Sequence, residues 1–190
     1  MASDNTISNV STGKPAIVGG IYVAPKGTTA PTNSTSTLGS SFKCLGYISE
    51  DGVTLSTSRE SDTVRDWGGD AILTPQTEFT DTVQFTMVEA INTDVLKVVY
   101  GKNNVSGSIA SGLTVNVNSK ELDEWVVVVD TLLRDGGTRR EVYPDAKPTE
   151  FGEVTFNRND PVGYEVTLTA FPDSNGNTHY IYAKEASTSA

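Results

Sequence analysis

The stretch Glu124-Trp125-Val126-Val127-Val128-Val129-Asp130-Thr131-Leu132-Leu133 is apolar at both odd and even positions. Successive side chains of a β-strand point to opposite faces, so this pattern predicts a strand that is covered on both faces. Asp135-Gly136-Gly137 follows and predicts a turn into a second strand over Thr138–Tyr143. We therefore expect this strand pair to lie at the structural centre of a mainly β protein.

Other segments predict strands with one buried and one polar face. Between Thr77 and Val88, the apolar residues Phe79, Val83, Phe85 and Met87 share one parity, and Glu78, Thr80, Thr82, Gln84 and Thr86 share the other. Similar alternation predicts strands at Leu113–Val117, Val154–Phe156 and Tyr164–Ala170, and shorter strands are expected at Ala16–Val23 and Thr178–Ala183. The chain is thus expected to be built largely from strands that bury one face.

A turn and a helix are expected in the first half of the chain. Glu50-Asp51-Gly52 separates the strand-like runs Phe42–Ile48 and Val53–Arg59, and Asp-Gly supplies the positive-φ residue of a hairpin turn. The periodicity then changes over Ile91–Gly101, where Asn92 or Thr93 can cap a helix and Gly101 can end it. We expect one helix of two to three turns there.

About ten strands and one helix, without a strand-helix-strand rhythm, predict an antiparallel β-sandwich or barrel with one flanking α-helix. The length of 190 residues suits a single domain. We expect a flexible N-terminal arm over 1–15, a domain over 16–184 and a C-terminal tail over 185–190. Within the domain, 26–41 is expected to be a long mobile loop and 59–73 an extended loop.

The composition limits the possible chemistry. The chain has 24 acidic and 14 basic residues, a formal charge of -10, which excludes a basic surface over the whole molecule. With Cys44 and His179 as its single cysteine and histidine, neither paired-histidine nor Cys/His metal sites can form. We interpret these two residues as ordinary packing and surface residues, and Asp173–Asn177 as a turn rather than a calcium loop. No enzyme activity, cofactor, metal or membrane span is expected.

Charge is concentrated between Glu50 and Asp81. This segment holds eight acidic residues and two arginines, a local charge of about -6, which is more than half of the total excess. One interpretation is an ordinary solvated hairpin surface. The other is a patch that lines up against a polyanion without holding it, because repulsion between like charges lowers affinity.

Several motifs, taken in order, resemble the major tail tube proteins of long-tailed, siphovirus-like bacteriophages. They are Leu45–Val53, Asp66-Trp67-Gly68-Gly69, Phe85–Glu89 with Val95–Gly101, and Gly163–Asp173 with Gly176-Asn177-Thr178. The resemblance implies a tail tube fold in which stacked hexameric rings form a conduit for DNA ejection. It also implies a place in the virion tail after assembly in the cytoplasm of the host bacterium.

The same resemblance implies partners and site residues. The partners are further copies of the chain, the tape measure, tail terminator and distal tail proteins, and double-stranded DNA that passes without specific binding; no membrane is involved. The candidate lumen-facing residues are Asp62, Asp66, Glu78, Thr80, Thr82, Gln84 and Thr86. The candidate contacts between subunits or rings are Arg59, Arg65, Trp67, Gly68, Gly69 and Asp70. The lumen candidates could equally lie on the outer tube surface, and Trp67 could equally anchor the core.

Two other classes of function remain open at this point. A β-sandwich that binds carbohydrate, or a virion decoration or adhesin module, would group exposed aromatic residues on one face, and Trp67, Trp125, Tyr180 and Tyr182 are available. A hydrolase on a β scaffold would need paired carboxylates in a cleft, for example Asp123 and Glu124 with Asp130.

Overall fold

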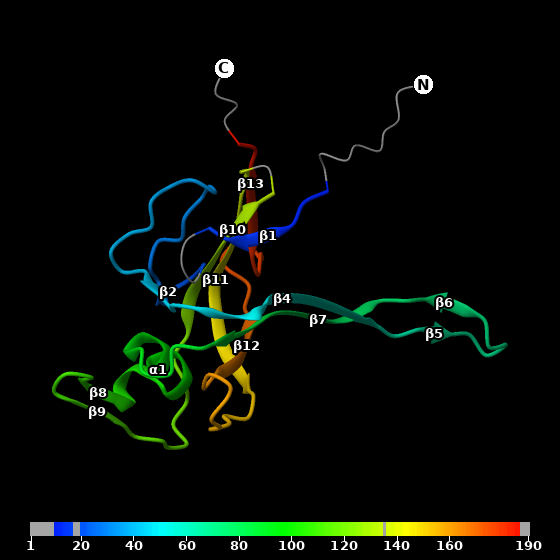
Figure 1. Cartoon of the computed structure of the whole chain (residues 1–190). Coiled ribbons are helices and arrows are strands. Elements are labelled where there is room, and N and C mark those ends of the chain that lie inside the picture. The colour runs from blue at the N-terminus through cyan, green and yellow to red at the C-terminus, as the bar shows by residue number, and fades with distance from the viewer. Residues whose placement is uncertain (1–9, 17–19, 135, 187–190) are drawn as a thin grey trace.

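The computed structural model describes residues 10–16, 20–134 and 136–186 of the chain. Its body is a curved antiparallel sheet with the strand order β3-β2-β10-β11-β12-β7-β4, to which β1 is added beside β10 and β13 beside β11 (Figure 1). The bounds are β1 Gly13–Pro15, β2 Ile21–Pro25, β3 Lys43–Cys44, β4 Ile48–Ser61, β7 Gln76–Met87, β10 Trp125–Leu133, β11 Thr138–Phe151, β12 Tyr164–Ala170 and β13 Tyr180–Lys184. All the pairings are antiparallel, so the predicted mainly β class with one α-helix is confirmed.

One short segment brings the two ends of this sheet together. After β3, the amide of Leu45 donates to the carbonyl of Ile21 in β2 at 3.0 Å. Just before β4, the carbonyl of Tyr47 accepts from the amide of Val88, next to β7, also at 3.0 Å. Because the segment bonds to both β2 and β7, the sheet curls around a single core that includes Val83, Phe85 and neighbouring apolar side chains.

The helix packs against this core. α1 (Thr93–Tyr100) lies within the predicted range and buries Val95, Leu96, Val98 and Val99, which are spaced as one face of a helix. The side chain of Asn92 accepts from the amide of Asp94 at 3.0 Å, which satisfies one of the free N–H groups of the first turn. After a 3-10 turn at Lys102–Asn104, the small hairpin of β8 (Val105–Ser108) and β9 (Gly112–Val115) lies beside the helix (Figure 1).

The central strand β10 is buried on both faces, as its sequence predicted. Val127 and Val129 face the core, whereas Val126 and Val128 are equally buried on the other side. The chain between β2 and β3 covers that outer side. Arg140 of β11 holds it there, since its Nη1 donates to the carbonyls of Asn33 and Ser36 at 3.0 and 2.9 Å. The segment predicted as the long loop 26–41 thus has anchors within its own chain that its composition did not indicate.

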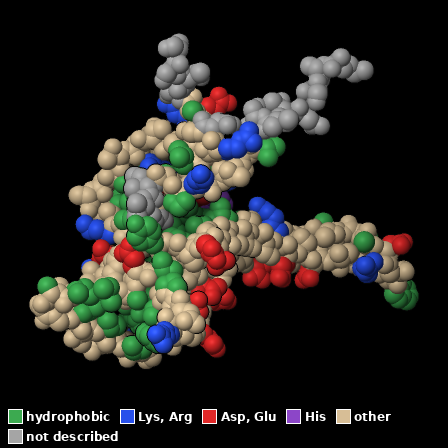
Figure 2. Space-filling model, in the orientation of Figure 1, with side chains coloured by type: hydrophobic (Ala, Val, Ile, Leu, Met, Phe, Trp, Pro, Cys, Tyr) green, Lys and Arg blue, Asp and Glu red, His purple; other side chains and the backbone are tan. Residues whose placement is uncertain are grey.

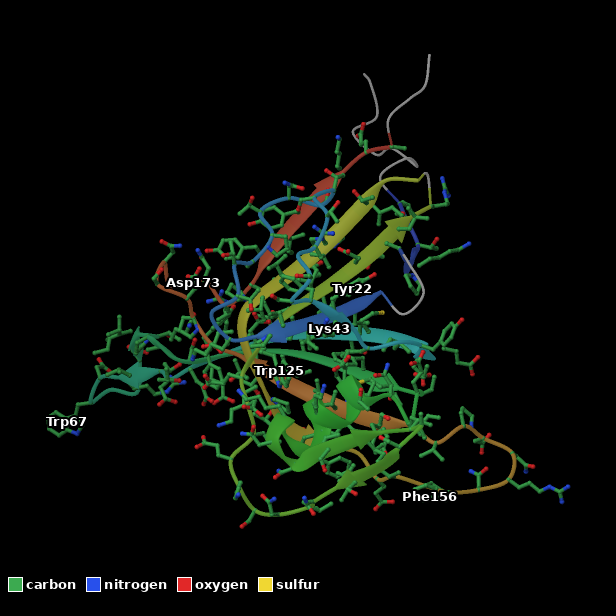
Figure 3. All side chains as sticks on the ribbon, turned by 90° about the vertical axis from the view of Figure 1, so that its left-hand side faces the viewer. Tyr22, Lys43, Trp67, Trp125, Phe156 and Asp173 are labelled. Atoms are coloured by element: carbon green, nitrogen blue, oxygen red, sulfur yellow. The ribbon has the colours of Figure 1, made fainter. Side chains whose placement is uncertain are left out.

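Two sequence predictions about strands are wrong. Glu50-Asp51-Gly52 does not form a hairpin turn, because it lies inside β4 as a bulge between the pairs Ile48↔Met87 and Val53↔Phe85. Gly52 has a positive φ of 74°, a backbone conformation that glycine adopts readily within a bulge. The strand expected at Val154–Phe156 is absent from the described chain, since β11 ends at Phe151 and residues 152–163 form none. Phe156 instead points outward and is 78% exposed (Figure 3).

The chain ends are only partly within the described residues. Most of the predicted arm 1–15 and tail 185–190 lies outside them, as do residues 17–19 of the strand expected at Ala16–Val23. Gly13–Pro15 pair with β10 as β1. No helix in the described parts of the chain is long and apolar enough to cross a lipid bilayer.

Candidate assembly surfaces

Strand β7 presents a polar face. Thr80, Thr82, Gln84 and Thr86 are half-buried and alternate with the buried Asp81, Val83, Phe85 and Met87. Glu78 lies on the same side of the strand as these polar residues, nearer the start of β7, and is exposed. The structure therefore brings five of the seven lumen candidates onto one face of one strand.

Neighbouring strands extend this face with residues that the sequence reasoning missed. The register places Thr54, Ser56, Ser58 and Glu60 of β4 opposite the polar side of β7, and Glu165, Thr167 and Thr169 of β12 on its other side. Gln84 Nε2 donates to Glu165 Oε1 at 2.6 Å, which links β7 to β12 across the face. Alternation in Tyr164–Ala170 was visible in the sequence, but only the register shows which polar residues share a face.

This face, which we call the polar face, carries hydroxyl and amide groups and a few carboxylates. On β4, β7 and β12 it contains Glu60, Glu78 and Glu165, and no lysine or arginine. Glu60 stands directly opposite Glu78, an arrangement in which like charges repel. On the next strand, β11, Lys147 stands opposite Thr169, and its Nζ is paired with Glu121. The three strands of the polar face themselves offer phosphate groups no cation to bind.

Asp62 and Asp66 do not join the polar face. Both lie farther out, where β4 and β7 leave the body and continue as a long hairpin through β5 (Val64–Arg65) and β6 (Ala71–Leu73) (Figure 1). Asp66 shapes the hairpin tip: its Oδ1 accepts from the amide of Asp70 at 2.8 Å, and its own amide donates to the carbonyl of Asp70 at 2.9 Å. Much of the predicted loop 59–73 is thus paired strand.

The hairpin carries all six residues predicted for contacts between subunits. Trp67 is fully exposed and extends from the tip (Figure 3), so its alternative interpretation as a core anchor is wrong. Arg65 Nη1 donates to the carbonyl of Gly69 at 2.9 Å, while Arg59 lies 4.4 Å above the ring of Phe79. Other exposed apolar side chains on the hairpin are Val64, Ile72 and Leu73. A soluble monomer rarely exposes so many apolar side chains together unless they have a partner.

A buried carboxylate fixes the root of the hairpin. Asp81 is 1% exposed and accepts from Thr178 Oγ1 at 2.5 Å, and His179 Nδ1 lies 2.5 Å from the same oxygen. The His179 ring also packs 5.1 Å from the ring of Tyr143, whose pKa is raised by burial and by the nearby Asp81 charge. His179 therefore contacts a buried carboxylate of its own chain and is not the ordinary surface or interface residue that the sequence suggested.

Asp173–Asn177 forms a turn that uses its own carboxylate. Asp173 Oδ1 accepts from the amides of Asn175 and Asn177 at 2.8 and 3.0 Å, and Tyr180 OH donates to Oδ2 at 2.6 Å. The Tyr180 hydrogen bond and then those of the amides hold the pKa of Asp173 below its usual value. Within the described chain, no group of three or more histidine, cysteine or acidic residues is arranged to hold a metal ion.

The residues required by the two rival functions do not converge. Asp130 pairs with Arg140, Asp123 with Lys102, and Glu124 with Lys26. Each carboxylate therefore has a different cation, and the three do not form a paired site. The four aromatic residues are also dispersed. Trp125 is buried, Trp67 is at the hairpin tip, and Tyr180 and Tyr182 stack on each other along β13.

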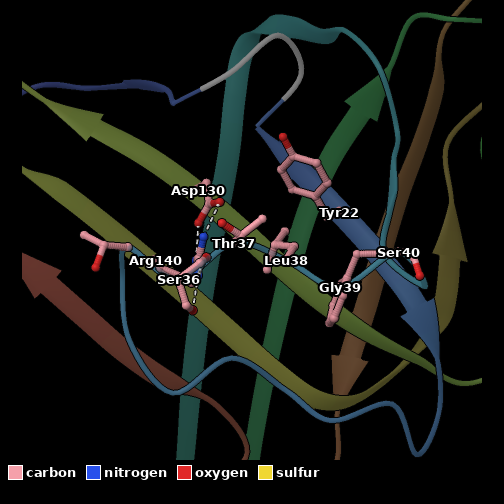
Figure 4. A pocket seen from close by; sticks show the side chains of 10 residues that line it. Tyr22, Ser36, Thr37, Leu38, Gly39, Ser40, Asp130 and Arg140 are labelled. Carbon is pink, nitrogen blue, oxygen red and sulfur yellow. Dashed lines mark hydrogen bonds and ion pairs between the residues drawn. The ribbon is translucent and has the colours of Figure 1, made fainter.

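A cavity of about 510 Å³ lies under the loop 26–41 (Figure 4). Tyr22, Leu38 and Phe42 line it together with loop hydroxyl groups, and the Asp130–Arg140 pair forms part of its wall. Arg140 Nε and Nη2 donate to the two oxygens of Asp130 at 2.5 and 2.8 Å, and both residues are at least nine-tenths buried. This pair stabilises the loop and already uses both oxygens of the Asp130 carboxylate.

Taken together, these surfaces define a β protein with a polar sheet face and a projecting hairpin (Figure 2). The sequence matches the family described as phage tail tube protein over residues 8–190. The chain belongs to that family and is a structural component of a phage tail. The family resemblance seen in the sequence is thereby confirmed.

Individual proteins are only distantly similar to this chain. No curated protein sequence matches the chain. Among solved structures, the tube-terminating cap of the anti-feeding prophage is 11% identical with a TM-score of 0.45, and covers 97% of this chain and 100% of that one. A chain of the extended sheath-tube complex of the PVC extracellular contractile injection system is 13% identical with a TM-score of 0.45, over 95% and 100% of the two chains. A chain of the PVC sheath/tube terminator is 16% identical with a TM-score of 0.41, over 88% and 96%.

Proposed function

We propose that this chain assembles with itself into stacked hexameric rings that form the tail tube of a long-tailed phage, and that DNA passes through the tube during ejection. The observation that carries the proposal is the polar face together with the two free edges of its sheet. Six copies per ring is the number that the family resemblance implies. The role is structural, without catalysis.

The part of the sheet that bears the polar face, beyond the segment that joins β2 to β7, is open at both sides. β4 is the last strand on one side, so its outer edge has no partner strand among the described residues. On the other side, the ladder between β11 and β10 ends at Ala146↔Trp125, whereas β11 continues to Phe151 beside β12. Unpaired strand edges favour pairing with another chain. The proposed ring pairs β4 of one copy with the outer part of β11 of the next.

Closure of this kind would turn the polar face into a continuous lining. The polar face has hydroxyl groups, few carboxylates and no cation on β4, β7 and β12, and Lys147 of β11 is paired with Glu121. The lining would therefore repel phosphates weakly and would not hold DNA at a fixed position. We assign Glu78, Thr80, Thr82, Gln84 and Thr86 to the lumen. Asp62 and Asp66 remain candidates for the lumen only through the hairpin that carries them, because they are not part of the polar face.

The proposal extends to partners and place of assembly. The tube would form in the host bacterial cytoplasm around a tape measure protein and would end at a terminator and at a distal tail protein. These partners follow from the family, and the free strand edges and the hairpin are the surfaces that this chain offers them.

Electron microscopy of the purified protein, before and after concentration, tests the proposal. The expected result is tubes of uniform bore, and a protein that stays monomeric at high concentration while binding a glycan would favour a decoration or adhesin module instead. Glu78→Lys tests the lining. We expect it to leave tube assembly intact and to slow genome delivery, whereas Glu185→Lys, beyond β13, should deliver DNA normally. Normal delivery by the Glu78→Lys phage would contradict the electrostatic role.

A further inference from the structure

The hairpin tip, residues 65–70, is held by several internal hydrogen bonds, and we call it the knob. Two backbone hydrogen bonds join Asp66 to Gly69 and to Asp70, at 3.1 and 2.9 Å, and the Asp66 and Arg65 side chains each add another within the tip. Trp67 extends from this frame without a ring contact in its own chain and is fully exposed. A large aromatic side chain on a pre-ordered frame loses little conformational entropy on binding, which is typical of the residues that dominate interfaces.

A cavity of about 420 Å³ lies elsewhere on the body, and we call it the socket. It lies between β1, the bulge at the start of β4, and the middle of β10. Pro15, Ile21, Ile48, Val53 and Val129 supply apolar walls, and Gly13, Gly20 and Gly52 also line the cavity. At Gly52 a Cβ would meet no atom within 4 Å.

The charges around the knob match those around the socket. The tip carries one cation, Arg65, and two carboxylates, Asp66 and Asp70, and the socket is lined by one exposed residue of each sign, Lys14 and Glu50. Two other cavities fit less well. Asp130 lines both the socket and the cavity under the loop 26–41, but the latter has no exposed charged residue in its lining. The one at the hairpin root contains Arg59 and His179 but no carboxylate.

Knob and socket cannot meet within one chain. The ladder between β4 and β7 runs without a break in pairing from Val53↔Phe85 to Glu60↔Glu78 and continues to Val64↔Leu73, so the hairpin is extended and leads away from the body (Figure 1). From Arg59 to Trp67 it adds about 25 Å at the usual rise per residue of a strand. A second copy of the chain must supply the partner.

We propose that the Trp67 indole of one copy inserts into the cavity between β1, the β4 bulge and β10 of another copy. Arg65 then faces Glu50 of that copy, and Asp66 or Asp70 faces its Lys14. Knob and socket are different surfaces, so the contact is head-to-tail and either closes into a ring or propagates along the tube. This inference rests on the proposed self-assembly and names the receiving site for the hairpin.

Photo-crosslinking tests the contact directly. Benzoylphenylalanine at position 67 is irradiated in assembled protein, and the cross-linked peptides are mapped by mass spectrometry. The expected cross-links join position 67 to residues 13–15, 48–53 or 129–131 of another copy. Tubes that form with cross-links only elsewhere would overturn the socket and leave the proposed tube intact. A protein that shows neither tubes nor intermolecular cross-links at any concentration would overturn both.

Two pairs of variants test the energetics. Trp67→Ala should raise the concentration needed for assembly by at least about tenfold, the scale of an interface hot spot, whereas Phe156→Ala, which removes another exposed aromatic side chain, should not. Ser49→Trp fills the socket and should have the same effect as Trp67→Ala, and Ser119→Trp on an exposed loop is its control. All four should show wild-type thermal unfolding as monomers. Assembly of Trp67→Ala or Ser49→Trp at the wild-type concentration would refute the contact.

Discussion

Replacing Arg140 by methionine tests how the loop 26–41 is held. The side chain of Arg140 joins three parts of the chain, because it donates to Asp130 of β10 and to the carbonyls of Asn33 and Ser36 in the loop. Methionine keeps most of the volume and removes the donors. We expect the Asp130 carboxylate to be left buried without its cation and the loop to lose its main anchor.

The expected loss of stability follows from the burial of the pair. The side chains of Arg140 and Asp130 are 5% and 10% exposed, so solvent cannot replace the missing partner. Breaking such a buried pair from one side costs about 3–5 kcal/mol. For a chain of this size that corresponds to a fall of roughly 6–20 °C in the midpoint of thermal unfolding.

The assay is urea unfolding of the monomer, below the concentration at which it assembles, together with amide hydrogen exchange. Exchange should rise across 27–41 and remain low in β12. Arg140→Met combined with Asp130→Asn should recover much of the loss, because the isolated charge is gone. Arg158→Met, the same change on an exposed segment, should stay within about 0.5 kcal/mol of wild type. An Arg140→Met protein with wild-type stability and unchanged loop exchange would refute the reasoning.

Three further variants test local features. Gly46→Ala should destabilise the fold by about 1–3 kcal/mol in urea unfolding. Gly46 has a φ of 76°, and a Cβ there would lie 2.0 Å from the Glu89 carboxyl carbon. Wild-type stability of this variant would refute the prediction. Asn92→Ala should cost about 1 kcal/mol by removing the helix cap, and an unchanged urea midpoint would count against it. Tyr180→Phe should destabilise the fold at neutral pH, because the hydroxyl hydrogen bond lowers the pKa of Asp173 below its ordinary value of 3.8. That contribution is complete above pH 3.8 and is lost as the pH falls through the lowered pKa, so the wild type and this variant should converge in acid, and a pH-independent difference would contradict it.

The sequence predicted features that local patterns determine. Alternation predicted the polar and apolar sides of β7, and the cap at Asn92 and stop at Gly101 predicted the ends of α1. These features depend on residues within one turn or one strand of each other. The family membership also came from sequence motifs, whereas composition alone indicated only an acidic domain without a metal site.

Pairings between distant segments could not be predicted from local patterns. Asp51-Gly52 suits a hairpin turn and a bulge equally well, and the partner that decides between them is β7, more than thirty residues away. The anchors of the loop 26–41 are two backbone carbonyls, which have no signature in the sequence. For the same reason Arg140 and Asp130 were not recognised as a pair, and the polar face was known on one strand only.

The hairpin links the stability of the subunit to assembly. Two strands alone are marginally stable in water, and beyond the Arg59–Phe79 contact this hairpin has no third strand or helix packed against it among the described residues. It nevertheless exposes Val64, Trp67, Ile72 and Leu73, which would favour collapse or aggregation in a monomer. The buried Asp81 at its root fixes its direction but cannot shield its tip. The proposed contacts with another copy would therefore add to the free energy that the hydrogen bonds of the ladder and tip supply, and they would make ring or tube formation the stable state.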